Sequence, residues 1–326
     1  MAQYSRLPGK RYGLSREQSI IIDKIYVTHG MGSNGPFYNN CFEYDINSNV
    51  WIERSPALYP RDGTGTWIYK NKLYVFGGRD TLVNAHGLPY AEVYDPKTDT
   101  WDEISPLPIS TADPGVTGLF HRGKYKIFVI GGYGKAPVDM LGCVQVYSPE
   151  NDKWDYGKYS AMLPPRWPIS AIYLNKYIYC YGGWYSRRSL LNYSINIVDG
   201  LKLFNPILLK KNSTPISQRY SIIQNRWEFL RPMPALLSEG LGWTTAILDY
   251  DKNEIHVFNG FNRSHYIHDT VRDQYIARRS MPVSKRWSSV SYYDKKIFSV
   301  GGGKSHKGKI SDTMEVYDTE LDIWYH

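Results

Sequence analysis

A tyrosine followed seven residues later by a tryptophan occurs five times along this chain, and this spacing constrains the fold more than any other feature. In four of the five cases, a glycine-containing turn lies 21 to 23 residues before the tryptophan. The pairs are Tyr44–Trp51, Tyr94–Trp101, Tyr147–Trp154, Tyr220–Trp227 and Tyr317–Trp324. A unit that recurs in this way predicts a fold built from copies of one supersecondary motif.

Six copies of the glycine turn can be counted. The second residues of these turns are 48, 54, 51, 77 and 42 residues apart, close to the length of a propeller blade. The turns are His29-Gly30, Gly77-Gly78, Gly131-Gly132, Gly182-Gly183, Asn259-Gly260 and Gly301-Gly302. No tyrosine–tryptophan pair follows Asn259-Gly260, so the fifth copy is degenerate.

Within a copy, an apolar run rich in β-branched and aromatic residues leads into the glycine turn, as in 72–78, 126–132 and 176–183. Such runs predict buried inner strands. A second strand ends in a tight turn such as 94–97, and an edge strand begins near the tryptophan. Strands crowded around an axis leave little room for side chains, which explains the paired glycines. We expect the tyrosine and tryptophan to pack between neighbouring blades.

These features resemble the kelch repeat, most closely in 91–101 and 314–324, and in the arginine that opens a blade after a proline, at Arg61, Arg166 and Arg286. The resemblance implies an all-β, six-bladed kelch β-propeller with four-stranded antiparallel blades. It covers nearly the whole chain, so we expect one domain over 1–326, with a closing segment over 1–14. The expected blades are 15–59, 60–109, 110–163, 164–235, 236–283 and 284–326.

Three irregularities interrupt the repeat. About 22 residues are inserted within 192–217 of the fourth blade. The chain stops two residues after Trp324, too early to complete an outer strand, so we expect the N-terminal segment around Tyr4–Pro8 to pair with the last blade and close the ring. In the fifth blade, 263–275 replaces the usual strand, turn and tryptophan, and Tyr275 is the candidate substitute for the missing aromatic. His265 and His268 lack a third metal ligand, so neither a metal site nor any cofactor is expected.

Composition restricts the partners. The formal charge is +8 and the isoelectric point about 9.1, which favours acidic partners. Lys and Arg are spread along the chain without the stripe typical of nucleic-acid binding. The N-terminus shows no secretory apolar region and the apolar runs are strand-sized, so we expect a cytoplasmic protein that does not enter a membrane. Cys41, Cys143 and Cys180 have no metal-like spacing and are expected to be core residues.

In a four-stranded antiparallel blade, the loop before the first strand and the loop between the second and third lie on one face. We call this face the binding face. With the four strands of a blade lettered A to D, it is built from the loops before A and between B and C. Arginine and aromatic residues there are typical of binding hot spots. The candidate partner-binding residues are Arg61, Arg79, Tyr133, Arg166, Trp184, Tyr185, Arg263, Arg286 and Trp287. For Arg61, Arg166 and Arg286, recurrence at one repeat position leaves a structural role equally open.

Three classes of function remain. The resemblance to kelch-like proteins implies a non-enzymatic module that binds a protein or peptide. It also implies a role as the substrate receptor of a cullin-type ubiquitin ligase, although no BTB or BACK region precedes the blades. An enzyme acting on sugars, similar to a sialic acid mutarotase, is the second class, and an actin-binding or cytoskeletal scaffold is the third. The predicted function is recognition of an acidic protein segment; the oligomeric state is not predicted.

Overall fold

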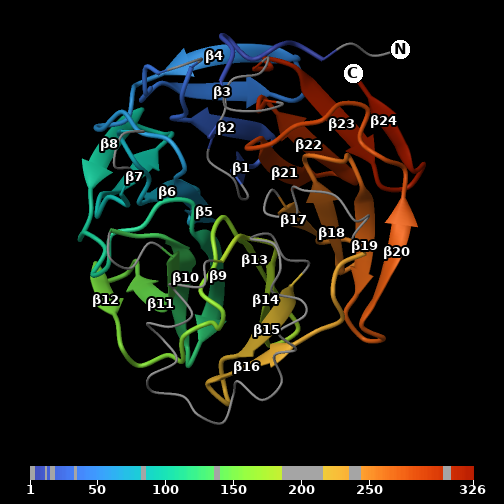
Figure 1. Ribbon diagram of the computed structural model, residues 1–326. Helices are drawn as coiled ribbons and strands as arrows, with labels where there is room; N and C mark the ends of the chain where they lie inside the picture. Colours follow the sequence, from blue (N-terminus) through green and yellow to red (C-terminus); the bar gives the residue numbers. More distant parts are fainter. Residues whose placement is uncertain are drawn as a thin grey trace.

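Six four-stranded antiparallel sheets are arranged around a central axis (Figure 1). The computed structural model describes residues 4–11, 13–14, 19–32, 35–81, 86–135, 140–185, 216–234, 244–303 and 310–326. Within these residues the secondary structure is strand, turn and bridge, and no helix able to cross a membrane is found. The predicted six-bladed all-β propeller is confirmed. Of the 192–217 insertion, only Ile216 and Ser217 belong to the described residues, and Ser217 begins β15.

Each blade is formed by four strands that are consecutive in the chain. The innermost strands are β1 (Ile20–Ile21), β5 (Gly65–Tyr69), β9 (Gly115–His121), β13 (Ser170–Leu174), β17 (Thr244–Asp249) and β21 (Ser289–Tyr293). The second strands are β2 (Lys24–Thr28), β6 (Lys72–Phe76), β10 (Lys124–Tyr133), β14 (Tyr177–Tyr181), β18 (Glu254–Asn259) and β22 (Lys296–Val300).

The two outer strands of each blade contain the repeated aromatic pair. The third strands are β3 (Cys41–Asp45), β7 (Ala91–Asp95), β11 (Met140–Ser148), β15 (Ser217–Ser221), β19 (His265–Asp269) and β23 (Met314–Asp318). The outermost are β4 (Val50–Arg54), β8 (Thr100–Glu103), β12 (Lys153–Asp155), β16 (Arg226–Phe229), β20 (Gln274–Arg278) and β24 (Ile323–Tyr325). Because all four strands alternate in direction, the turns after the first and third strands lie on the face opposite the binding face.

The tyrosine and tryptophan of the repeat join neighbouring blades. In the second blade, the buried Tyr94 hydroxyl donates to Asp99 Oδ1 at 2.6 Å, and this oxygen also accepts the backbone N–H of Ser55, which follows the first blade. The Trp101 indole donates to the Ser55 carbonyl at 2.9 Å. Equivalent bonds recur with Tyr44, Tyr147, Tyr220 and Tyr317. The packing role predicted for the pair is therefore observed, with a hydrogen-bonding role added.

Blade five keeps this arrangement with other residues. β19 and β20 are both present, which corrects the expectation that 263–275 lacks the usual strand and turn. His268 takes the place of the tyrosine, with its Nε2 3.0 Å from Asp273 Oδ1. Tyr275 stacks on His268 with ring centroids 4.6 Å apart. Tyr275 thus takes the position of the missing tryptophan, as predicted.

The second glycine of the turn forms a second connection between blades. The N–H groups of Gly30, Gly78 and Gly132 donate to the carbonyls of Arg61, Thr111 and Arg166, each in the following blade. Gly132 has φ 99°, and a Cβ there would lie 2.1 Å from Thr111 Oγ1. Both the backbone conformation and the close approach therefore require glycine.

The ring closes between blade six and blade one (Figure 1). Gly302 N–H donates to the Arg11 carbonyl, and Leu7 N–H to that of Asp312, while Trp51 donates to Ser5. The N-terminal segment thus contacts both blades, but none of its described residues forms a strand with β24. Contrary to expectation, the outer strand of blade six comes from the C-terminus, because three residues suffice to pair β24 with β23.

Candidate binding face

Two of the predicted arginines are enclosed by protein. The guanidinium of Arg61 is fully buried, with its Nη2 2.5 Å from Glu92 Oε1, and that carboxylate oxygen also lies 3.2 Å from His29 Nε2. Arg166 is fully buried and donates to the carbonyls of Gly182 and Ile216 and to the Gln218 side chain at 2.7 to 2.9 Å. Burial lowers the pKa of Arg166 to about 10. This geometry supports the structural alternative for both arginines.

The third member of this repeat position is Lys285, not Arg286. Arg61, Arg166 and Lys285 each lie four residues before the first residue of an innermost strand. The ammonium of Lys285 is buried, pairs with Glu315 and donates to the Thr313 carbonyl at 2.6 Å. In blade six the arginine lies three residues before the inner strand and not four, so the distance to that strand, and not the residue type, defines the repeat position.

The residue that follows the glycine pair occupies a second repeated position on the binding face. It forms a backbone bridge to the loop before the first strand, in the pairs Asp62–Arg79, Ala112–Tyr133, Trp167–Trp184 and Arg286–Gly303. Side chains at this position differ from blade to blade, unlike those of the buried cations. Variation at a fixed, loop-borne position is typical of a binding surface on a rigid scaffold.

Arg79 is held by two acids. Its Nε and Nη2 donate to the two oxygens of Asp62 at 2.8 and 3.2 Å, and its Nη1 lies 3.6 Å from Asp113. All three side chains are at least 94% buried. Because one guanidinium faces two carboxylates, this cluster does not attract an acidic partner. Asp62 was missed by sequence reasoning, although it directly follows the conspicuous Arg61.

Aromatic rings continue from Arg79 across blades three and four. The Arg79 guanidinium carbon lies 5.9 Å from the ring centre of Trp167, and Tyr133 meets the same indole edge-on at 5.3 Å. Trp184 bridges to Trp167 through the backbone and is half-buried, whereas Tyr185 is buried. The structure thus brings together Arg79, Tyr133 and Trp184 among the predicted site residues.

The remaining predicted residues lie in blades five and six. Arg286 is half-buried, with its guanidinium carbon 4.5 Å from the ring centre of Phe261. Arg263 is exposed and donates to the Pro282 carbonyl at 3.2 Å, while Trp287 is buried. Arg286 and Arg263 are therefore the predicted arginines that are not buried.

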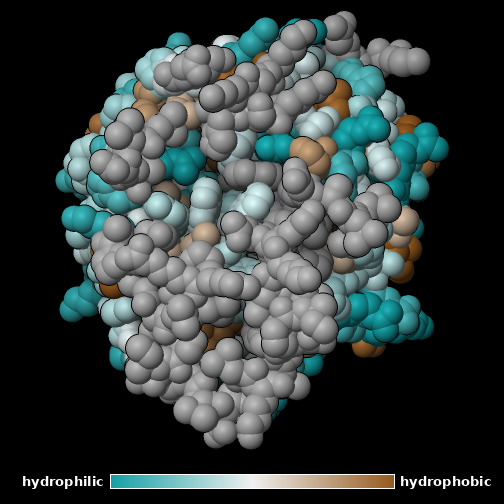
Figure 2. Space-filling model, viewed as in Figure 1, coloured by the Kyte–Doolittle hydropathy of each residue, from teal (hydrophilic) through white to brown (hydrophobic). Residues whose placement is uncertain are grey.

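A cavity of about 670 Å³ lies between blade six and the N-terminal segment. It is lined in part by Arg6, Lys10, Val283 and Lys285, the first two of which are exposed. Arg6 lies 3.6 Å from Asp312 in the same wall. Among the described residues visible in Figure 2, hydrophilic side chains cover much of the outer rim. The sector of blades five and six thus combines an open cavity with the exposed cations Arg6 and Lys10, and the acids in its lining, Asp312 and Glu315, pair with Arg6 and Lys285.

Comparison with known proteins agrees with this fold. Residues 2–183, more than half of the chain, match the KLHDC2/KLHL20/DRC7 Kelch-repeats domain. The chain belongs to this kelch-repeat family. It is 30% identical to Kelch-like protein 25 of Xenopus tropicalis over 49% of this chain and 27% of that protein. Identity to human Kelch-like protein 15 is 28% over 48% of this chain and 28% of that protein. The kelch resemblance drawn from the repeat is confirmed.

The matched curated relatives are thus covered over only about a quarter of their length. Among solved structures, the kelch chain resembles "Structure of YjhT" with a TM-score of 0.72 and 14% identity, over 99% of both chains. At this identity the likeness concerns the fold alone.

Proposed function

We propose that this kelch propeller is a non-enzymatic interaction module that binds an acidic protein segment on its binding face, in the sector of blades five and six. The observation that carries the proposal is the open cavity beside blade six, bordered by the exposed cations Arg6 and Lys10. Planar guanidinium groups suit carboxylates because they donate two parallel hydrogen bonds.

Arg263 and Arg286 extend this positive surface. Arg263 reaches Pro282, next to the cavity residue Val283, and Arg286 follows the cavity residue Lys285 in the chain. An arginine stacked on an aromatic ring, as Arg286 is on Phe261, is preorganised and loses little conformational entropy on binding. The aromatic surface of Tyr133, Trp167 and Trp184 would contact a less charged part of the same partner.

The kelch resemblance extends the proposal to cytoplasmic substrate recognition for a cullin-type ubiquitin ligase. In that case the ligase-binding region would be contributed by another part of the protein or by a separate chain. Co-purification of a cullin with the captured partner would test this extension.

The proposal is tested by capturing partners from cell extract with the wild-type chain and with an Arg263→Ala/Arg286→Ala variant. The control is Lys97→Ala/Lys153→Ala, two exposed cations at the opposite-face ends of blades two and three. We expect only the Arg263→Ala/Arg286→Ala variant to lose a partner. A synthetic acidic segment of that partner should bind this variant at least about tenfold more weakly than it binds the wild-type chain, as expected for lost charge-assisted contacts. Equal capture of the partner by both variants, at equal melting temperatures, would contradict the proposed binding site.

A further inference from the structure

Blade five departs from the other blades at two alternating positions of its second strand. His256 occupies the position filled by an aromatic ring elsewhere, at Tyr26, Tyr74, Phe128, Tyr179 and Phe298. Glu254 takes the position of a lysine in four blades, at Lys24, Lys72, Lys126 and Lys296. Side chains two residues apart on a strand point to the same side. The two changes therefore place an imidazole and a carboxylate together.

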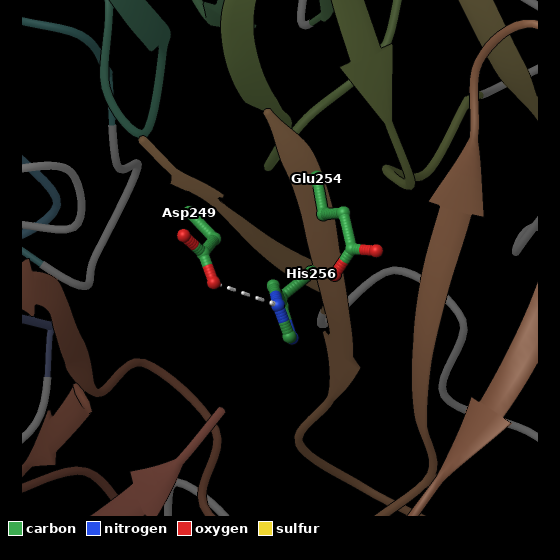
Figure 3. Close-up of side chains that lie close together, drawn as sticks. All are labelled: Asp249, Glu254 and His256. Carbon is green, nitrogen blue, oxygen red and sulfur yellow. Dashed lines mark ion pairs between the residues drawn. The ribbon is translucent and has the colours of Figure 1, made fainter. Parts of the chain in front are cut away.

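Asp249 completes the group from the neighbouring strand. It is the last residue of β17 and lies opposite Glu254 in the register of β17 and β18. One potential ligand atom from each of Asp249, Glu254 and His256 lies within 4.8 Å of the other two. Figure 3 shows the three side chains turned toward one another between the two strands. Asp249 and His256 are at least 99% buried, whereas Glu254 is half-buried.

The hydrogen bonds around His256 determine which of its nitrogens carries the proton. His265 Nδ1 lies 3.3 Å from the Arg279 carbonyl, which can only accept, so this nitrogen is protonated. His265 Nε2 is then the acceptor for His256 Nδ1, 2.9 Å away. In the neutral ring, His256 Nε2 is left with its lone pair, directed at Asp249 Oδ2 across 3.9 Å.

Two acceptors therefore face one another in a buried position. Neither His256 Nε2 nor Asp249 Oδ2 has a hydrogen-bond partner. The other oxygen of Asp249 accepts the N–H groups of Asp251 and Lys252. The nearby Tyr292 hydroxyl donates to Asp251 at 2.7 Å and also interacts with Asp249. A buried arrangement of this kind is unfavourable unless something positive or hydrogen-donating lies between the two atoms.

Lys252 lies in the turn between β17 and β18, close to the group in the chain. Lys252 does not fill the gap, since its ammonium donates to the Thr319 carbonyl at 2.6 Å.

We propose that Asp249, Glu254 and His256 bind one divalent zinc ion, with His265 as the residue that orients His256. One imidazole and two carboxylates form a ligand set that Zn²⁺ accepts, with a fourth position for water. A ligating histidine that donates its other N–H to a fixed acceptor is the usual arrangement around such ions. The half-exposed Glu254 provides the route by which the ion enters. The site joins β17 to β18 in the blade that lacks the tyrosine–tryptophan pair.

The test is zinc binding by the untagged full chain. After chelator treatment and dialysis, we expect one Zn²⁺ per chain by elemental analysis at micromolar free metal, and a higher melting temperature with Zn²⁺ than with Mg²⁺. Co²⁺ in its place should give the visible absorption of a four-coordinate ion. Glu254→Gln should weaken Zn²⁺ binding at least about tenfold, because it removes a charged ligand.

The matched control is Glu320→Gln, an exposed glutamate of blade six paired with Lys295, which should leave zinc binding unchanged. His256→Phe restores the aromatic residue of the other blades and should fold without binding zinc. The proposal is overturned if the wild-type chain binds no zinc at these concentrations, if both glutamine variants bind equally well, or if a water molecule alone bridges Asp249 and His256 in crystals grown with zinc.

Discussion

At the residue scale, a position that recurs in several blades serves the fold, and the neighbouring position is the one we propose for binding. Arg61, Arg166 and Lys285 are buried against ion-pair or hydrogen-bond partners, whereas Arg286 stacks on an exposed phenylalanine. The physical difference is the environment of the charge. A buried cation depends on its partner carboxylate, and a solvated one does not.

Arg61→Met should therefore lower the free energy of unfolding by about 3 to 5 kcal/mol, because it leaves the Glu92 carboxylate buried without its guanidinium partner. Urea denaturation measures the change. Arg286→Met is the matched control and should cost less than about 1 kcal/mol. Arg61→Met/Glu92→Met should recover part of the loss, and a double variant as unstable as the sum of its single changes would contradict a coupled pair.

At the scale of the element, blades are joined by side-chain bonds on their outer strands and by glycine contacts near the axis. The tryptophan of one blade donates to the carbonyl that follows the preceding blade, and the second glycine of a turn donates to the following blade. Each blade is thereby linked in both directions along the chain. Blade five keeps the outer contact through Asp273, which accepts the backbone N–H of Arg231 after blade four, and through His268, whose Nδ1 lies 2.7 Å from the Tyr181 hydroxyl.

Gly132→Ala should destabilise the propeller by clearly more than Gly123→Ala. Both glycines have positive φ, 99° and 75°, so both substitutions cost backbone strain of about 1 kcal/mol. Only at Gly132 does the added methyl group meet other protein atoms, those of Thr111, Ala112 and Pro114 in the loop that opens its own blade, whereas nothing lies within 4 Å at Gly123. Thermal melts of the two variants compare them. Equal losses would show that the glycine–blade contact adds nothing to the backbone requirement.

At the scale of the whole molecule, the ring is completed by a segment that is not a strand. Leu7 and Leu14 pack with the core residues of blades one and six, and Tyr4 contacts Phe298 edge-on at 6.3 Å. An open seam would expose the apolar sides of both blades to water, so closure stabilises the other blades as well.

Leu7→Ala should lower the free energy of unfolding by about 2 to 5 kcal/mol, as expected for a leucine that is 2% exposed. The comparison is Leu58→Ala in a loop after blade one, where the side chain is 43% exposed and the cost should stay below about 1 kcal/mol. Denaturant titrations of both variants provide the measurement. A Leu7 variant as stable as the Leu58 variant would argue against closure by this segment.

Acid should destabilise the whole ring, starting near pH 6.5. Burial lowers the pKa values of His29 and His268 below the usual value of about 6.5. The unfolded chain therefore takes up protons first as pH falls, and each histidine reduces the free energy of unfolding by up to about 1.4 kcal/mol per pH unit. Denaturation at pH 7.5, 6 and 5 measures the slope. Constant stability over this range, or imidazole resonances of His29 and His268 that titrate near 6.5 in the folded protein, would contradict this prediction.

The sequence alone determined the architecture, because the Tyr–Trp spacing and the glycine turns reflect contacts that every blade must make. It also indicated Tyr275 as the substitute aromatic of blade five. The tertiary structure decided which cations are buried, since Lys285 and Arg286 are adjacent in the chain, yet Lys285 is buried and Arg286 is half-buried. It alone brought Asp113 to Arg79, and His265 to His256 rather than to His268. Such pairings depend on how strands and blades align in space, and local sequence spacing does not specify that alignment.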